Sequence, residues 1–269
     1  MKTEQKRPVS LTIEGAVAQI ILSEPQSRNA LSDNMRAGLR DAVFELSQQK
    51  DLGALILTGS DGAFCAGGDL KALHAQHSSK HAPLAEDLLK RMKDLHGWLR
   101  QLRDISLPVI VAVDGPAFGA GLGLALTGDI ILASTRAQFC APFCKVGVVP
   151  DGNLFYSLPR MVGLQRAREL FYSGRVVDAE EAQRIGLCME VLPPENLLDR
   201  ARDIAEMMCD SSPTAFSLTK SITARSFDLD SEALLQLEAQ AQAICLSSDY
   251  HKDAVDRFVN KEPLRFAFR

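Results

Sequence analysis

Positive charge is not in excess in this 269-residue chain, because 30 Lys and Arg residues face 34 Asp and Glu residues and the formal net charge is -4. A domain that binds nucleic acid carries a basic patch or stripe that neutralises phosphate groups. We therefore expect no nucleic-acid partner. A local basic pocket for a phosphorylated small molecule remains compatible with this balance.

Long apolar runs are also missing. No stretch of 18 apolar residues occurs, so the sequence offers no membrane-spanning helix. Residues 1–8 are polar and lack the apolar centre of a signal peptide. We expect no membrane association and no export, and hence a cytoplasmic protein.

Cysteine pairs with redox or zinc spacing are absent. The six cysteines form no C-x-x-C pair, and free Cys in apolar company behaves as a small hydrophobe. A chain with 46% hydrophobic residues can bury a core without disulfides or metals. His74, His77 and His81 could share one helical face, but we find no carboxylate or Cys that would complete a metal site beside them. The sequence predicts no metal.

Short apolar runs alternate with helical periods. Two strands are expected on either side of Glu14-Gly15, and Ser32 is a candidate N-cap for a helix with apolar residues at i, i+4 spacing. Further expected elements are strands at 54–57, 109–113 and 130–133, a long helix at 84–102, and a long amphipathic stretch at 231–258. This succession predicts an α/β core over residues 1–200 and a helical region over residues 201–269. No linker marks the boundary.

Two glycine-rich segments, 58–71 and 114–125, each run from a strand through small residues into the start of a helix. Glycine lets a backbone approach a ligand closely, and a helix N-terminus presents unpaired N–H groups. Taken singly, each segment is also explained by a tight turn and close helix packing. A dinucleotide-binding loop is excluded, because the third glycine and the later acidic residue are missing.

The two segments together resemble the enoyl-CoA hydratase/isomerase (crotonase) superfamily. Matching pieces follow the family's order over nearly the whole chain: Arg28-Asn29-Ala30-Leu31-Ser32, Phe64 through Lys71, Gly115 through Asp129, Phe143 through Gly152, and Ala182-x-x-x-Gly186-Leu187. The resemblance implies an α/β superhelix of ββα repeats with a C-terminal helical trimerisation region, giving homotrimers or hexamers. It also implies an acyl-CoA thioester substrate and no further cofactor.

By the same resemblance, the main-chain N–H groups of Gly68 and Ala120 grip the thioester oxygen. Charge develops on that oxygen as an enolate forms, so preorganised donors stabilise it. Many relatives carry Gly where this chain has Ala120. Because the donor is main chain, Ala serves there if its φ is negative, whereas a positive φ would be strained.

The two glutamates of family hydratases correspond here to Gly123 and Phe143, neither of which can move a proton. Asp151 aligns instead with the acidic residue of several family isomerases, including the Δ3,Δ2-enoyl-CoA and phenylacetate-pathway enzymes. On local grounds alone, Asp151 before Gly152 also fits a turn or a helix N-cap. We expect Asp151 to act as a single general base and acid, in a dry pocket to which Phe143 and Phe155 contribute.

The coenzyme A contacts implied by the resemblance lie in three places. Arg28 and Lys71 would meet the phosphates, and main-chain atoms of Ala66 and Leu70 the adenine. Asp69 lies in the same motif, where a helix cap is the simpler role. Phe258 and Lys261 match a C-terminal pair that reaches a neighbouring subunit's coenzyme A, although a core Phe and a solvated Lys explain them equally well.

An acyl-CoA isomerase is the expected function. The alternatives are a hydratase working with one carboxylate, a dehalogenase with Asp151 as nucleophile, and an inactive CoA-binding member. The dehalogenase would need a nearby histidine, for which His74 is the only loose candidate. RNA binding, known in one family branch, is disfavoured by the net negative charge.

Overall fold

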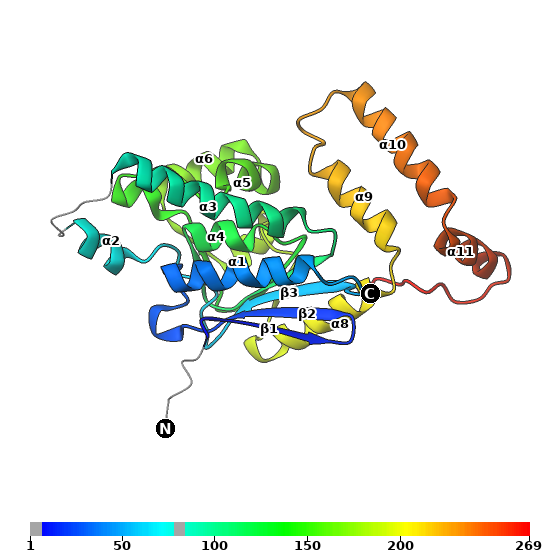
Figure 1. The fold of residues 1–269 in the computed structure, drawn as a ribbon, viewed down its shortest axis with the longest axis horizontal. Helices are drawn as coiled ribbons and strands as arrows, with labels where there is room; N and C mark the ends of the chain where they lie inside the picture. Colours follow the sequence, from blue (N-terminus) through cyan, green and yellow to red (C-terminus); the bar gives the residue numbers. More distant parts are fainter. Residues whose placement is uncertain (1–6, 78–83) are drawn as a thin grey trace.

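The computed structural model describes residues 7–77 and 84–269, which build two β-sheets covered by helices (Figure 1). The large sheet contains, in spatial order, β1 (Val9–Glu14), β2 (Val17–Leu22), β3 (Ala54–Gly59), β4 (Val109–Val113), β6 (Ile130–Ser134) and β9 (Glu190–Leu192). The small sheet contains β5 (Pro116–Phe118), β7 (Gln138–Cys140) and β8 (Val176–Asp178). In the large sheet only β1 and β2 pair antiparallel, which confirms the expected hairpin.

The helices cover both faces of the large sheet and extend beyond it. They are α1 (Asp33–Ser47), α2 (Leu70–His77), α3 (Ala85–Asp104), α4 (Ala120–Ala125), α5 (Leu154–Val162), α6 (Leu164–Ser173), α7 (Ala179–Arg184), α8 (Leu197–Cys209), α9 (Pro213–Thr223), α10 (Ser231–Leu246) and α11 (Asp249–Val259), with 3-10 turns η1 (Pro25–Ser27), η2 (Pro142–Val146) and η3 (Pro194–Asn196). Among the described residues, none of these helices combines the length and apolarity needed to cross a membrane.

Both faces of the central strands are buried. In β3, Leu55 and Leu57 face one core cluster, which includes residues of α1 and α3, while Ala54 and Ile56 face a second cluster that α8 covers. Successive strand residues point to opposite faces. A strand that is buried on both faces therefore has apolar residues at successive positions, and the sequences of these strands show this pattern.

The N-terminus of α1 confirms the predicted cap. The Ser32 hydroxyl accepts a hydrogen bond from the Met35 N–H at 3.1 Å, which satisfies one of the unpaired donors of the first turn. The apolar residues at i, i+4 spacing are all buried. This helix fixes the position of the segment that precedes it, residues 28–31.

Strand–strand–helix units recur along the chain. The unit β4–β5–α4 is followed by β6–β7–η2, and in each unit the first strand joins the large sheet and the second the small sheet. Parallel pairing of β4 with β6, and of β5 with β7, stacks one unit on the next. The expected ββα repeat is thereby confirmed.

The C-terminal region differs from the expected single amphipathic stretch, because the helix is interrupted at Ser247 and forms α10 and α11. Ser248 caps the second of these helices. Helices α9 to α11 bury no residue and project from the core as an arm (Figure 1). Residue 200, the expected boundary, falls inside α8, whose apolar face packs on the sheet. The arm is joined to the core by Lys220, whose Nζ lies 2.6 Å from the Asp129 carboxylate.

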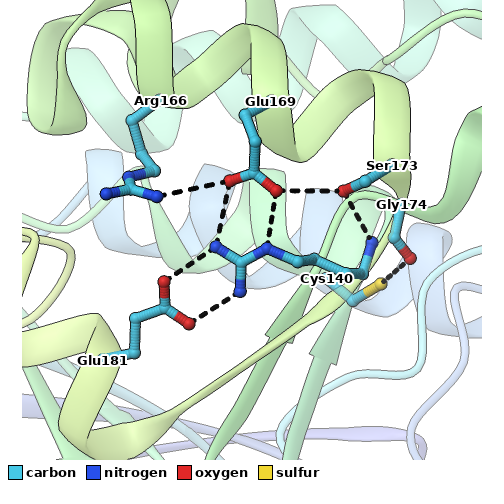
Figure 2. Close-up of polar contacts among 7 residues, drawn as sticks. Cys140, Arg166, Glu169, Ser173, Gly174 and Glu181 are labelled. Carbon is cyan, nitrogen blue, oxygen red and sulfur yellow. Dashed lines mark hydrogen bonds and ion pairs between the residues drawn. The ribbon is translucent and has the colours of Figure 1, made fainter.

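A network of charged side chains holds the segment after α6. The Arg175 guanidinium donates two hydrogen bonds to Glu169 of α6 and two to Glu181 of α7, at 2.6–2.9 Å (Figure 2). The guanidinium holds the pKa of both carboxyls below the usual range. Beside this network, the Cys140 thiol donates to the Gly174 carbonyl at 3.3 Å. These contacts hold the end of β7, from which the chain enters η2.

Candidate active site

The two glycine-rich segments contact each other through their backbones. The Cys65 N–H donates to the Pro116 carbonyl at 2.8 Å, and the Phe118 N–H donates to the Cys65 carbonyl at 2.9 Å. These bonds form a short parallel bridge between Cys65 and Ala117. The turn after β3 and the turn after β4 are therefore fixed relative to each other.

Gly67 allows this close approach. Its φ is +87°, and a β-carbon there would lie 2.4 Å from the Phe118 carbonyl oxygen and 3.5 Å from the Ala120 amide nitrogen. Any side chain at this position would push the turns apart. Gly68, the next residue, is exposed with open space around its α-carbon, while Ala120 is the first residue of α4.

The two expected oxyanion donors lie on neighbouring turns with their amides unused. Among the described residues, neither the Gly68 nor the Ala120 N–H donates to a protein acceptor. Gly119 takes the positive φ of the second turn, +55°, and Ala120 is not among the non-glycine residues with positive φ. Alanine therefore fits at position 120 without the strain that a positive φ would bring.

Gly123 packs directly against Gly152. A β-carbon at Gly123 would lie 2.3 Å from the Gly152 carbonyl oxygen, and one at Gly152 would lie 3.3 Å from the α-carbons of Ala120 and Gly123. The backbone after Asp151 thus occupies the space that a side chain at position 123 would need. Because Asp151 directly precedes Gly152, this contact also brings Asp151 close to the N-terminal turn of α4.

Asp151 is a half-buried acid in which one carboxylate oxygen has no hydrogen bond to the described residues. Its Oδ1 atom is shielded from solvent and has no hydrogen-bond partner among the described residues. Asn153, in a left-handed conformation, is the N-cap residue of α5, so the helix-cap interpretation of Asp151 is wrong. Burial raises the pKa of the Asp151 carboxyl above its ordinary value, and the charge of His96 lowers it by a smaller amount.

The two phenylalanines expected around Asp151 differ in their surroundings. Phe143, in η2, is 7% exposed, and its ring lies 3.6 Å from the position of a β-carbon on Gly119. Phe155 is 60% exposed and packs edge-on against Phe171, with ring centroids 5.5 Å apart. Phe143 is thus buried beside the second turn, whereas Phe155 is largely exposed, and its part in enclosing a pocket stays a prediction.

The residues expected near coenzyme A fall into two groups. Arg28 and Lys71 are exposed beside the first turn, and the Ala66 N–H donates to the Arg28 carbonyl at 2.9 Å. Leu70, the first residue of α2, is also exposed, and Asp69 Oδ1 accepts from the Ala72 N–H at 3.0 Å, which confirms the helix cap.

The second group lies on the arm. Phe258 is 75% exposed, and Lys261 follows α11. Figure 1 shows α11 far from α2 and α4, so these two residues do not meet the turns of their own chain. A buried core position for Phe258 is wrong.

Two residues near the site were missed in the sequence. His96, exposed on α3, is the histidine whose charge reaches Asp151. The sequence instead indicated His74. The helical periodicity around His96 does not show that this residue lies near Asp151, 55 positions away. Asn29 was visible only as part of a motif. It is fully buried, and its contacts extend to the first turn.

The sequence placed His74, His77 and His81 at a spacing that could share one helical face. His81 and the side chain of His77 lie outside the described residues, so the predicted shared face is not described. Across the described residues there is no group of three or more His, Cys, Asp or Glu side chains arranged to hold a metal.

Comparisons with known proteins agree with this geometry. Residues 12–269 match the family model described as enoyl-CoA hydratase/isomerase. The chain is 30% identical to a short-chain-enoyl-CoA hydratase of Clostridium acetobutylicum, over 95% of this chain and 96% of that protein. It is 31% identical to the 1,2-epoxyphenylacetyl-CoA isomerase of Escherichia coli, over 94% and 96%.

Solved structures give the same result. The crystal structure of an enoyl-CoA hydratase/isomerase from Cupriavidus metallidurans is 38% identical and covers 97% of this chain and 98% of its own, with a TM-score of 0.89. A match of this extent in sequence and fold, with the two glycine turns in contact, shows that the chain belongs to the enoyl-CoA hydratase/isomerase (crotonase) family.

Proposed function

We propose that this protein is an acyl-CoA isomerase of the enoyl-CoA isomerase type, in which Asp151 is the only general base and acid. The observation that carries the proposal is the half-buried Asp151 carboxyl, whose Oδ1 atom is shielded from solvent and has no hydrogen-bond partner among the described residues. Asp151 directly precedes Gly152, which packs against the helix that begins at Ala120. Burial raises the pKa of the Asp151 carboxyl, which makes its ionised form a stronger base, and the protonated form can then return the proton. The names of relatives include both hydratases and an isomerase.

The proposed reaction is a 1,3-proton shift. The Asp151 carboxylate takes a proton from C2 of a 3-enoyl-CoA, and the electron pair delocalises over the thioester and the C3–C4 double bond. The N–H groups of Gly68 and Ala120 stabilise the charge on the thioester oxygen. The protonated Asp151 then returns the proton to C4, and the product is a 2-enoyl-CoA. A ring-derived unsaturated acyl group would react in the same way.

Incubation with 3-enoyl-CoA and with 2-enoyl-CoA in D₂O tests this proposal. We expect 2-enoyl-CoA to form and deuterium to enter at C2 or C4. Formation of 3-hydroxyacyl-CoA would instead identify a hydratase working with one carboxylate. Halide release from a halogenated aromatic acyl-CoA would identify Asp151 as a nucleophile. Binding of coenzyme A without turnover across an acyl-CoA panel would identify an inactive CoA-binding member.

The contact between Gly123 and Gly152 argues against two-carboxylate hydration. We expect Gly123→Glu to lower stability without producing hydratase activity, because the new side chain would collide with the Gly152 carbonyl oxygen 2.3 Å from its β-carbon. Overpacking of this kind costs about 1–3 kcal/mol. Thermal unfolding and a hydration assay with 2-enoyl-CoA measure both effects. Unchanged stability, or rapid hydration, would contradict the prediction.

Coenzyme A binding rests on the residues beside the first turn. We propose that Arg28 and Lys71 contact its phosphates and that main-chain atoms of Ala66 and Leu70 contact the adenine. Coenzyme A then enters as part of the substrate, and the proposed proton shift needs no further cofactor. Phe258 and Lys261 are proposed to contact the coenzyme A of a neighbouring subunit.

We propose a homotrimer, or a hexamer made of two trimers, as the resemblance implies, and the exposed apolar side chains of the arm support a subunit interface there. Exposed large apolar side chains recur along α10 and α11: Leu235, Ile244, Leu246, Val255 and Phe258. Such surfaces mark protein–protein interfaces. Sedimentation should give three or six times the chain mass of 29.3 kDa, and a monomer at micromolar concentration would contradict the assembly. A cytoplasmic location stays part of this proposal.

A further inference from the structure

Asn29 is a fully buried polar residue that joins two segments of the site. Its Oδ1 atom accepts from the Glu24 N–H at 2.8 Å, and its Nδ2 donates to the Ala63 carbonyl at 2.7 Å, with a longer contact to the Ser60 carbonyl at 3.4 Å. Its own N–H donates to the Glu24 carbonyl at 2.9 Å. The side chain therefore closes the loop of residues 24–29 and fastens this loop to the turn after β3.

The same segment supports the turn farther along. The Arg28 carbonyl accepts from the Ala66 N–H at 2.9 Å, and the Leu31 N–H donates to the Gly67 carbonyl at 2.7 Å. Leu31 and Gly68 form a parallel bridge. The turn is thus held on one side by residues 28–31 and on the other by β5, and the Gly68 amide lies between these supports.

The backbone at Asn29 adopts an unfavourable conformation. Arg28 and Asn29 have φ values of +52° and +56°, so two consecutive non-glycine residues lie in the left-handed region, which residues with a β-carbon rarely adopt. Asparagine tolerates this region better than most residues. Such strain persists only where surrounding contacts enforce it, and at Asn29 the enforcing contacts are the carboxamide bonds to Glu24 and Ala63.

We propose that Asn29 is a positioning residue that sets the Gly68 N–H for the thioester oxygen. This inference rests on the proposed function, because it assumes that Gly68 donates to a thioester. Asn29 touches no substrate in this account. It acts by holding residues 60–68 and residue 28 in one rigid unit.

Asn29→Gly tests the inference, because glycine accepts a φ of +56° freely and only the carboxamide is lost. We expect kcat and kcat/KM to fall together by about 10–10², since a small misplacement of a reacting group costs up to about 10². The fall should be the same for an acyl-pantetheine, which lacks the phosphoadenosine. Arg28→Ala should weaken only the reaction of the full acyl-CoA.

A direct readout separates this inference from the proposed function. A saturated acyl-CoA with a ¹³C-labelled carbonyl should show a downfield shift when it binds the wild type, and a smaller shift with Asn29→Gly. No shift with the wild type would overturn the proposed hydrogen bonds from Gly68 and Ala120 to the thioester oxygen. An equal shift with both proteins, or an unchanged kcat, would overturn only the role of Asn29.

A variant elsewhere in the core tests whether a general loss of stability could explain the effect. Thr127→Val removes another buried bond from a side chain to the backbone, the 2.7 Å bond to the Leu124 carbonyl. We expect it to lower the melting temperature but to leave kcat and the carbonyl shift at wild-type values.

Asn29→Asp keeps the acceptor and loses the donor to Ala63, so its carbonyl shift should resemble that of Asn29→Gly. A wild-type shift in Asn29→Asp would overturn the role assigned to the Ala63 contact.

Discussion

Replacing Asp151 with asparagine should lower kcat for isomerisation by about 10²–10⁴, the usual contribution of a positioned general base. Asparagine keeps the shape of the side chain but cannot take a proton. Binding should change little, because the role proposed for Asp151 is in the proton transfer and not in the coenzyme A contacts. Steady-state kinetics with a 3-enoyl-CoA measure the loss, and a variant that keeps full activity would disprove the assignment.

The pH profile gives an independent check on Asp151. The base works only when ionised, so kcat/KM should rise with pH through the Asp151 pKa, which burial places above the ordinary value of 3.8. His96→Gln removes a positive charge that favours the ionised carboxyl, so this rise should move to higher pH. A rise that stays at the wild-type pH would show that His96 does not act on the base. The melting temperature of Asp151→Asn should not fall, because burial already disfavours the charged form that asparagine replaces.

Replacing Ala120 with proline should lower kcat by about 10²–10³, because proline has no N–H and one oxyanion donor is lost. Ala120 is the first residue of α4, a position where proline suits a helix. The substitution therefore removes the donor while the helix can still form. Kinetics with the same 3-enoyl-CoA and circular dichroism measure both parts of the prediction.

Ala120→Gly is the matched control for that variant. It keeps the N–H and introduces the residue that many relatives carry, so we expect activity within a few-fold of the wild type. The pair separates the loss of a donor from a change of side chain. Full activity in Ala120→Pro would show that this amide does not bind the thioester oxygen.

Most of the fold could be predicted from local patterns. The β-hairpin around Glu14-Gly15 and the Ser32-capped helix followed because their signals lie within a few residues. The break at Ser247 did not follow, because apolar residues continue on both sides and only the Ser248 cap separates the helices. The contact of Phe155 with Phe171 joins two helices, so no local pattern contains it.

The site could be predicted where its parts are backbone and follow a motif. The two glycine turns followed from the motif, and the structure confirms that they contact each other. The roles of Gly68, Ala120 and Asp151 stay predictions. His96 and Asn29 were missed for different reasons. His96 reaches Asp151 only through tertiary packing, and the role of Asn29 depends on bonds to Ser60 and Ala63 more than 30 positions away.

The packing of Gly123 against Gly152 also restricts how such a chain can change its reaction over evolution. A first substitution that adds a carboxylate at position 123 meets the Gly152 backbone and loses stability before any new activity is available. The loop after Asp151 would have to move first, and that movement displaces the acid on which the present proposed reaction depends. Either order of substitutions therefore first loses stability or displaces the proposed acid, before a second carboxylate can take part in the reaction.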